Sequence, residues 1–298
     1  MDKKLNLALV GFGRFGKKYF KEIKKNDYFS LKTVFRKNVY NNKIYKKLSL
    51  KNIISNNINA AIICTPSDTH FKISKLFIQN KIPIILEKPA ASNIKQIKKL
   101  IQLSKKNKTT VIINHSDLFN ENFIMLVSKL KLIGKIHSFT CYFGKFSKAY
   151  KNKKYLPYQD WFPHPLAIIL KLFNKVNKVQ VNSNSIKIKN KIISQKTEIF
   201  LKCKKNINGK IFFSNQSSGK KRIIKIYGKN GMINYDGYNY TNNYVKLKKK
   251  LVYGKSNRTP LENIIKKLHE KIKKKRFYSD LKLSLEIEKI MVKIKKKL

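Results

Sequence analysis

Three closely spaced glycines lie between a strand pattern and a helix pattern, and this placement limits the fold more than any other feature. The apolar run Leu5–Val10 ends at Gly11, and Gly13 and Gly16 follow at G-x-G-x-x-G spacing as an amphipathic segment begins. Such glycines permit a tight turn, close approach of a phosphate to the backbone, and close packing of helix on strand. The pattern predicts a dinucleotide-binding βαβ unit, with an ordinary strand–turn–helix connection as the alternative.

Strand and helix patterns alternate as far as Asn114. We expect strands at Leu5–Val10, Phe29–Arg36, Ala60–Cys64, Ile82–Leu86 and Val111–Asn114, separated by helices at Phe15–Lys25, Phe71–Asn80 and Ile94–Lys105. Short apolar strands separated by helices indicate a parallel sheet that is covered on both faces. Residues 1–117 are therefore predicted to form an α/β Rossmann domain with a doubly wound parallel sheet.

Beyond this point strand patterns follow one another without intervening helices. We expect strands at Ile136–Phe146, Val176–Lys189, Lys196–Lys204, Gly209–Asn215, Arg222–Tyr227 and Gly231–Tyr235, and helices at Phe123–Leu132, Leu261–Lys275 and Leu281–Lys297. Consecutive strands of this kind favour antiparallel pairing. Residues 118–298 are therefore predicted to form an α+β domain with a mostly antiparallel sheet, which would bind the substrate and support oligomerisation.

The formal net charge of +53 raises the question of whether the chain binds nucleic acid. Only five of its 68 cationic side chains are arginine, and the lysines are spread along the whole chain. Proteins that read bases depend on the bidentate contacts of arginine to guanine and on clustered basic faces. We therefore expect weak adsorption to polyanions at low salt and no specific nucleic-acid partner.

The three cysteines are isolated, and none has a Cys or His neighbour at metal-ligand spacing. This predicts no metal site and no structural disulfide, as in a reducing compartment. The sequence contains no run of about 18 apolar residues of the kind that spans a membrane. Gly11 and Arg14 interrupt the first apolar run too early for a signal peptide. We expect a cytoplasmic protein.

Six short motifs occur in an order that resembles the Gfo/Idh/MocA oxidoreductases. They are the glycine motif, Thr65-Pro66 with His70, Glu87-Lys88-Pro89, Asn114-His115 with Phe119-Asn120, Ile133-Gly134, and Asp160-Trp-Phe-Pro-His164. The resemblance covers nearly the whole chain. It implies NAD(P)-dependent hydride transfer at a carbon of a sugar, cyclitol or nucleotide sugar, by a homodimer or homotetramer.

By this resemblance, Lys88, Asp160 and His164 match the catalytic residues of the family. Oxidising an alcohol needs a hydride acceptor, a base for the hydroxyl proton, and a cation near the oxygen. His164 is a natural proton acceptor near neutral pH, and Asp160 could orient it from the same side of a helix start. Lys88 would lie at the carboxyl end of a strand, where such sheets bind ligands. Taken singly, the three could instead be a surface lysine, a helix cap and a packed loop histidine.

The motifs also assign the cofactor. The predicted cofactor-binding residues are Gly11, Gly13, Arg14, Phe15, Gly16, Arg36, Lys37, Thr65, Pro66, His70, Glu87 and Lys88. An NAD site usually carries an acidic residue about 20 positions past the glycines, where this chain has Arg36. No Asp or Glu occurs between Asp27 and Asp68, and Arg36 with Lys37 would attract a 2′-phosphate. We therefore expect NADP(H) as the preferred cofactor, with NAD(H) as the alternative.

Three residues depart from the family pattern. Pro165 stands where an acidic residue usually continues the helix, Leu118 where many relatives carry arginine, and Phe162 where glycine is common. Leu118 and Phe162 are expected to reshape the substrate pocket, so the identity of the substrate is not carried over.

Two other classes of function remain open from the sequence. A non-catalytic NAD(P)-binding sensor or regulator would bind the cofactor and should lack the Lys/Asp/His set, which this chain keeps. An enzyme with a tightly held cofactor, such as a glycosidase or a two-substrate oxidoreductase, would retain that cofactor through purification.

Overall fold

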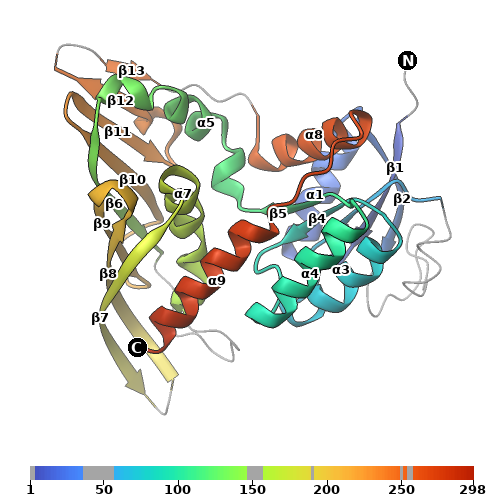
Figure 1. Cartoon of the computed structure of the whole chain (residues 1–298), viewed down its shortest axis with the longest axis horizontal. Coiled ribbons are helices and arrows are strands. Elements are labelled where there is room, and N and C mark those ends of the chain that lie inside the picture. The colour runs from blue at the N-terminus through green and yellow to red at the C-terminus, as the bar shows by residue number, and fades with distance from the viewer. Residues whose placement is uncertain (1–3, 36–56, 146–156, 189–190, 249–250, 254–257) are drawn as a thin grey trace. The chain divides into compact units, whose positions relative to one another are not determined.

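The computed structural model describes residues 4–35, 57–145, 157–188, 191–248, 251–253 and 258–298 of the chain (Figure 1). These residues divide into two compact units. The first contains Met1–His115 and Pro260–Leu285, and the second contains Ser116–Thr259 and Glu286–Leu298. We expected a single boundary at 117/118, with all later residues in one domain. In the structure, the segment Pro260–Leu285 groups with the first unit instead.

A five-stranded parallel sheet forms the centre of the first unit. Its strands are β1 (Leu5–Val10), β2 (Phe29–Phe35), β3 (Ala60–Ile63), β4 (Ile84–Glu87) and β5 (Val111–Asn114), in the order β2-β1-β3-β4-β5. All neighbouring pairs are parallel. Strands β3, β4 and β5 are buried along their whole length, as expected for strands covered on both faces. The prediction of an α/β Rossmann domain is confirmed.

Helices cover both faces of this sheet (Figure 1). On one face, α3 (His70–Gln79) and α4 (Ile94–Lys106) contribute Phe77 and Leu100 to an apolar cluster with alternate strand residues. On the other face, α1 (Arg14–Lys25) and α8 (Pro260–Lys273) pack against each other, and α8 also packs on β4 and β5. Side chains of a strand alternate between faces, so each strand supplies both layers.

Helix α8 and the residues after it explain why the C-terminal part returns to the first unit. Ile264, Ile265 and Leu268 on α8 are fully buried. The chain then runs beside β5, where the amide of Val111 donates to the carbonyl of Tyr278 at 2.9 Å. This segment covers a strand edge that would otherwise expose unpaired backbone groups.

An eight-stranded sheet forms the centre of the second unit, in the order β13-β12-β11-β10-β6-β9-β8-β7. Its strands are β6 (Ile136–Gly144), β7 (Val176–Ile188), β8 (Lys191–Cys203), β9 (Asn208–Ser214), β10 (Lys221–Gly228), β11 (Gly231–Asp236), β12 (Tyr244–Leu247) and β13 (Leu251–Tyr253). Every neighbouring pair is antiparallel except β6 and β9. The predicted mostly antiparallel sheet is confirmed, although the pattern did not reveal β12 and β13.

Two consecutive short helices, α6 (Pro157–Trp161) and α7 (Pro163–Phe173), pack on one face of this sheet. Phe173 stacks on Phe139 of β6 with ring centroids 5.5 Å apart, and Phe162 meets Phe213 of β9 at 5.7 Å. Most residues of α7 are buried, including Pro163 and Pro165 in its first turn.

The helix expected at Phe123–Leu132 begins earlier and ends earlier. Helix α5 spans Glu121–Ser128, and a 3-10 turn follows at Leu130–Ile133. Asn120 sets its start, because the side-chain oxygen accepts hydrogen bonds from the amides of Asn122 and Phe123. The last helix, α9 (Leu281–Lys295), continues across the boundary between the two units at Leu285.

Candidate functional site

The three glycines of the motif occupy the turn from β1 into α1, and each has a different steric reason to be glycine. Gly11 has φ +104°, and a Cβ there would lie 2.7 Å from the backbone of Cys64 at the end of β3. A Cβ on Gly16 would lie 2.3 Å from the carbonyl oxygen of Gly11. Gly13 is exposed, and its Cβ would meet nothing within 4 Å. We call the loop 11–16, together with Cys64 and Thr65, the glycine cradle.

The cradle lies at the switch point of the parallel sheet. Strand order reverses between β1 and β3, and the loops that leave these two strands touch at Gly11 and Cys64. The Cys64 thiol donates to the Gly11 carbonyl at 3.1 Å, and burial, aided by Glu87, raises its pKa to about 12. A ligand bound at the carboxyl ends of these strands would therefore meet a rigid backbone surface.

The start of α1 is suited to an anion. Gly13 is the N-cap and supplies no side chain, and no acidic residue occurs in the first turn of this fully described helix. Its first amide groups therefore have no capping partner from that residue, and they lie at the positive end of the helix dipole. Above Gly13 the space is open. These features fit the pyrophosphate of a dinucleotide.

His70 links two loops at the same edge of the sheet. Its Nδ1 lies 2.7 Å from the carbonyl oxygen of Pro89, and its Nε2 lies 2.9 Å from that of Thr65. The loops after β3 and β4 are thereby joined by one buried imidazole. Burial lowers the pKa of His70, opposed by these two hydrogen bonds. His70 thus has a structural role in joining these loops, and its place among the cofactor-binding residues remains a prediction.

Glu87 and Lys88 lie at the end of β4 and point to different environments. Glu87 is buried and accepts a hydrogen bond of 2.6 Å from Asn114 at the end of β5. Burial raises the pKa of Glu87, while Asn114 and the adjacent Lys88 oppose the shift. Lys88 is half-buried, and the Lys88–Pro89 peptide bond is cis. A cation is thus placed at the ligand-binding edge of the sheet.

The remaining predicted cofactor residues divide into two groups. Arg14 is exposed at the start of α1, with its guanidinium 5.3 Å from the ring centroid of Phe15. Pro66 is exposed beside Thr65. Arg36 and Lys37 lie outside the described residues, so their expected contact with a 2′-phosphate remains a prediction.

Within the second unit, Asp160 and His164 lie in different helices. Asp160 is exposed on α6, whereas His164 lies in the first turn of α7, where its side chain is 11% exposed. His164 forms an ion pair with Asp117, whose Oδ2 lies 3.3 Å from the imidazole Nδ1. Asp117 belongs to the 3-10 turn Ser116–Phe119 directly before α5.

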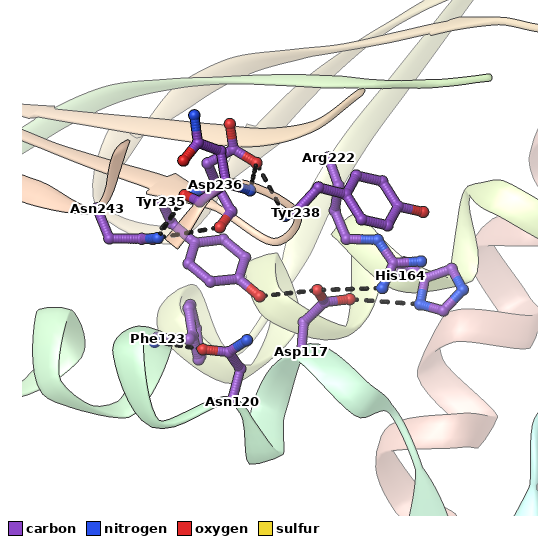
Figure 2. Close-up of polar contacts among 10 residues, drawn as sticks. Asp117, Asn120, Phe123, His164, Arg222, Tyr235, Asp236, Tyr238 and Asn243 are labelled. Atoms are coloured by element: carbon purple, nitrogen blue, oxygen red, sulfur yellow. Dashed lines mark hydrogen bonds and ion pairs between the residues drawn. The ribbon is translucent and has the colours of Figure 1, made fainter. Parts of the chain in front are cut away.

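Asp117 is the centre of a buried polar cluster (Figure 2). Its Oδ1 accepts from the Tyr235 hydroxyl at 2.9 Å and from Arg222 Nη1 at 3.4 Å. The side chain of Asp117 is 4% exposed. Burial alone would raise the pKa of Asp117, but Arg222, His164 and Tyr235 together hold it well below its usual range. We call Asp117, His164, Arg222 and Tyr235 the Asp117 cluster.

The turn after β11 holds the other side of Arg222. Asp236 accepts hydrogen bonds from the amides of Tyr238 and Asn239, at 2.9 and 3.0 Å. This brings the Tyr238 ring 5.2 Å from the guanidinium carbon of Arg222 (Figure 2). Asp117 and the ring together raise the pKa of Arg222 against the effect of burial. Arg222 is therefore a fixed cation, held between a carboxylate and an aromatic face.

Sequence reasoning did not assign a role to Asp117, Arg222 or Tyr235. Asp117 follows the last strand of the Rossmann domain by three residues, and the sequence shows this position. Its partners, however, lie 47 to 118 positions further along the chain. Only the pairing of β10 with β11, which puts Arg222 and Tyr235 near each other, brings them together.

Among the described residues, no group of three or more His, Cys, Asp or Glu side chains could hold a metal ion. The helices in the described part of the chain are all too short or too polar to cross a membrane.

Comparison with curated sequences identifies several oxidoreductases. The uncharacterized oxidoreductase YhhX of Escherichia coli is 22% identical over 202 residues, which cover 62% of this chain and 58% of that protein. The scyllo-inositol 2-dehydrogenase (NADP(+)) IolU of Bacillus subtilis is 29% identical over 92 residues, covering 31% and 28%. The matched regions thus span less than two thirds of either relative.

Solved structures show the same architecture over the whole chain. UDP-N-acetylglucosamine 3-dehydrogenase GnnA from Acidithiobacillus ferrooxidans superposes with a TM-score of 0.86, covering 100% of this chain and 98% of GnnA at 14% identity. Residues 5–115 match the model of the oxidoreductase family with an NAD-binding Rossmann fold. By this match, the domain formed by residues 5–115 belongs to the Gfo/Idh/MocA family of oxidoreductases.

Proposed function

We propose that the chain is an NAD(P)(H)-dependent dehydrogenase or reductase that transfers hydride between nicotinamide and an alcohol carbon of a sugar, cyclitol or nucleotide sugar. The observation that carries the proposal is the glycine cradle at the switch point, with Lys88 at the end of β4 on the same sheet edge. IolU and GnnA, by their names, act on an inositol and on a nucleotide sugar.

The cradle and α1 would hold the pyrophosphate, and a bound nicotinamide supplies the hydride acceptor or donor. In the oxidative direction, His164 would take the proton from the hydroxyl group on the substrate carbon that is oxidised. The Lys88 ammonium would stabilise negative charge on the substrate oxygen as that proton leaves. Asp160, by its spacing, and Asp117, by its contact, are the two carboxylates that could orient His164. In reduction, His164 returns the proton to the new alkoxide.

Two substitutions test the catalytic assignment. Lys88→Ala and His164→Ala should each reduce turnover by at least about a hundredfold while cofactor affinity stays within about threefold, because neither side chain belongs to the glycine cradle. Lys98→Ala on α4 and His137→Ala on β6 are matched controls, since both side chains are exposed. Near-normal turnover in both site variants would remove the proposed chemistry.

A fluorescence titration with NADPH and NADH at moderate salt tests the cofactor. Salt is needed because a protein with a net charge of +53 attracts any polyanion. We propose NADP(H) as the preferred partner, so NADPH should bind more tightly, and Arg36→Ala should remove most of the difference. Equal binding would leave the enzyme assignment and discard the role of Arg36 and Lys37. Binding without turnover on a sugar and nucleotide-sugar panel would favour a sensor.

A further inference from the structure

The geometry points to Asp117 as the positioning residue of His164: its carboxylate fixes which imidazole nitrogen carries the hydrogen and so leaves Nε2 as the proton acceptor. The catalytic role of this proton position rests on the proposed function. The proton position on His164 depends only on residues of the second unit, so it can be measured without substrate or cofactor.

The hydrogen position follows from what each group can donate. Arg222 only donates hydrogen bonds, and the Tyr235 hydroxyl is directed at the same oxygen, Oδ1. Two donors on one oxygen, one of them a permanent cation, favour the ionised carboxylate. An ionised carboxylate only accepts, so the imidazole nitrogen that lies 3.3 Å from Oδ2 is attracted to it when that nitrogen carries a hydrogen.

This assigns the neutral tautomer of His164. With the hydrogen on Nδ1, the lone pair of the neutral ring lies on Nε2, which can then take a proton from a substrate hydroxyl. A nearby buried carboxylate also stabilises the imidazolium that forms in this step. Serine hydrolases use an aspartate beside histidine in this way, and there the wrong tautomer costs about four orders of magnitude in turnover.

Burial separates Asp117 from the other acidic candidate. Asp117 is 4% exposed and held by side chains from two strands and a helix, whereas Asp160 is exposed on α6. A carboxylate in a water-poor environment exerts a stronger field on its neighbour than one in solvent. Asp117 is therefore the carboxylate expected to control the protonation of His164.

The Asp117→Asn variant tests the assignment through donor and acceptor chemistry. Its amide oxygen would keep the place of Oδ1, because Arg222 can only donate to it. Its NH₂ group would then face Nδ1 of His164, which must become an acceptor, and the ring hydrogen would move to Nε2. The volume of the side chain hardly changes, so a loss of activity would come from the hydrogen pattern rather than from a cavity.

The measurement is long-range ¹H–¹⁵N NMR of the five histidines, with His164 assigned by its loss in His164→Gln. We expect the Nδ1–H tautomer in the wild-type protein and the Nε2–H tautomer in Asp117→Asn. Tyr235→Phe keeps the carboxylate and is the matched control, and it should retain Nδ1–H. In Asp117→Asn, turnover should fall at least about a hundredfold with cofactor affinity unchanged.

The tautomer of His164 in each variant either supports or overturns the positioning role of Asp117. An Nε2–H tautomer in the wild-type protein overturns the assignment even if Asp117→Asn fails to fold. A tautomer that is unchanged in Asp117→Asn, or that changes in Asp160→Asn, also overturns it. The expected tautomers in a protein without dehydrogenase activity would uphold the positioning role and reject the proposed function, so the two failures are distinguishable.

Discussion

The glycine cradle offers backbone groups to a ligand, whereas the Asp117 cluster offers side chains. In the cradle, six successive residues and the end of one neighbouring strand supply the whole surface. In the cluster, four side chains come from a 3-10 turn, a helix and two strands. The shape of the glycine cradle therefore depends on the absence of side-chain atoms at Gly11 and Gly16. The stability of the Asp117 cluster depends on the attraction between its buried carboxylate and the cations beside it.

The two regions should consequently fail in different ways. An added methyl group in the cradle meets rigid backbone, which costs packing energy at any pH. A neutralised group in the cluster leaves a buried partner charge uncompensated, which makes the cost depend on pH. Three predictions, in decreasing order of expected effect, examine this difference.

The largest effect is expected for Gly16→Ala, which should lower the free energy of unfolding by about 3 kcal/mol at any pH between 5 and 8. The new Cβ would lie 2.3 Å from the Gly11 carbonyl oxygen, and that backbone has no room to move because Gly11 itself lies against Cys64. Urea denaturation measures the loss. Gly13→Ala is the control and should change stability by less than about 0.5 kcal/mol, since its Cβ meets nothing within 4 Å. Equal losses in the two variants would contradict the steric account.

A smaller effect, of about 2 kcal/mol at pH 7, is expected for Asp117→Asn. The pKa of Asp117 is lower in the folded chain than in the unfolded one. Its contribution to stability is therefore complete above the unfolded value near 4 and is lost as the pH falls towards the folded value. Urea midpoints of wild-type and variant protein should approach each other progressively as the pH is lowered from about 5 to about 2. A difference that stays constant across this range would mean that the carboxylate charge is not what stabilises the cluster.

The smallest effect, of about 1 kcal/mol, is expected at His70, which links the loops after β3 and β4. Burial lowers its folded pKa below the unfolded value of about 6.5, so its contribution is complete above that pH and declines as the pH falls further. Thermal melts of wild-type and His70→Asn protein from pH 8 to pH 5 measure this decline. The wild-type protein should lose more stability than the variant on acidification, and parallel curves would contradict the titration of His70.

The comparison also shows where sequence patterns are informative. Gly11, Gly13 and Gly16 were assigned from their spacing because steric rules act between near neighbours, and the structure gives each of them the expected environment. The lone positive φ in this loop belongs to Gly11, where the motif requires a tight turn. The order of strand and helix patterns likewise predicted both sheet types, since the apolar pattern of a short segment is a local property.

The sequence did not reveal which carboxylate meets His164. The spacing of four residues predicts that Asp160 orients His164, and this stays a prediction, because Phe162 between α6 and α7 keeps helical backbone angles. Asp117 meets His164 across 47 positions of sequence. Nor did the pattern show that the segment around Pro260–Leu285 packs with the first unit, since its apolar stripe fits any apolar surface.

The sequence by itself determined the glycine cradle, the two sheet types and the position of Lys88 after β4, because these depend on backbone sterics and on periodicities within short segments. Only the tertiary structure decided the Asp117 cluster, because the energy of a buried charge depends on partners that approach from distant strands. The pairing of β10 with β11 carries Arg222 and Tyr235 to Asp117, and these long-range contacts help to hold the pKa of the Asp117 carboxyl group well below its usual range.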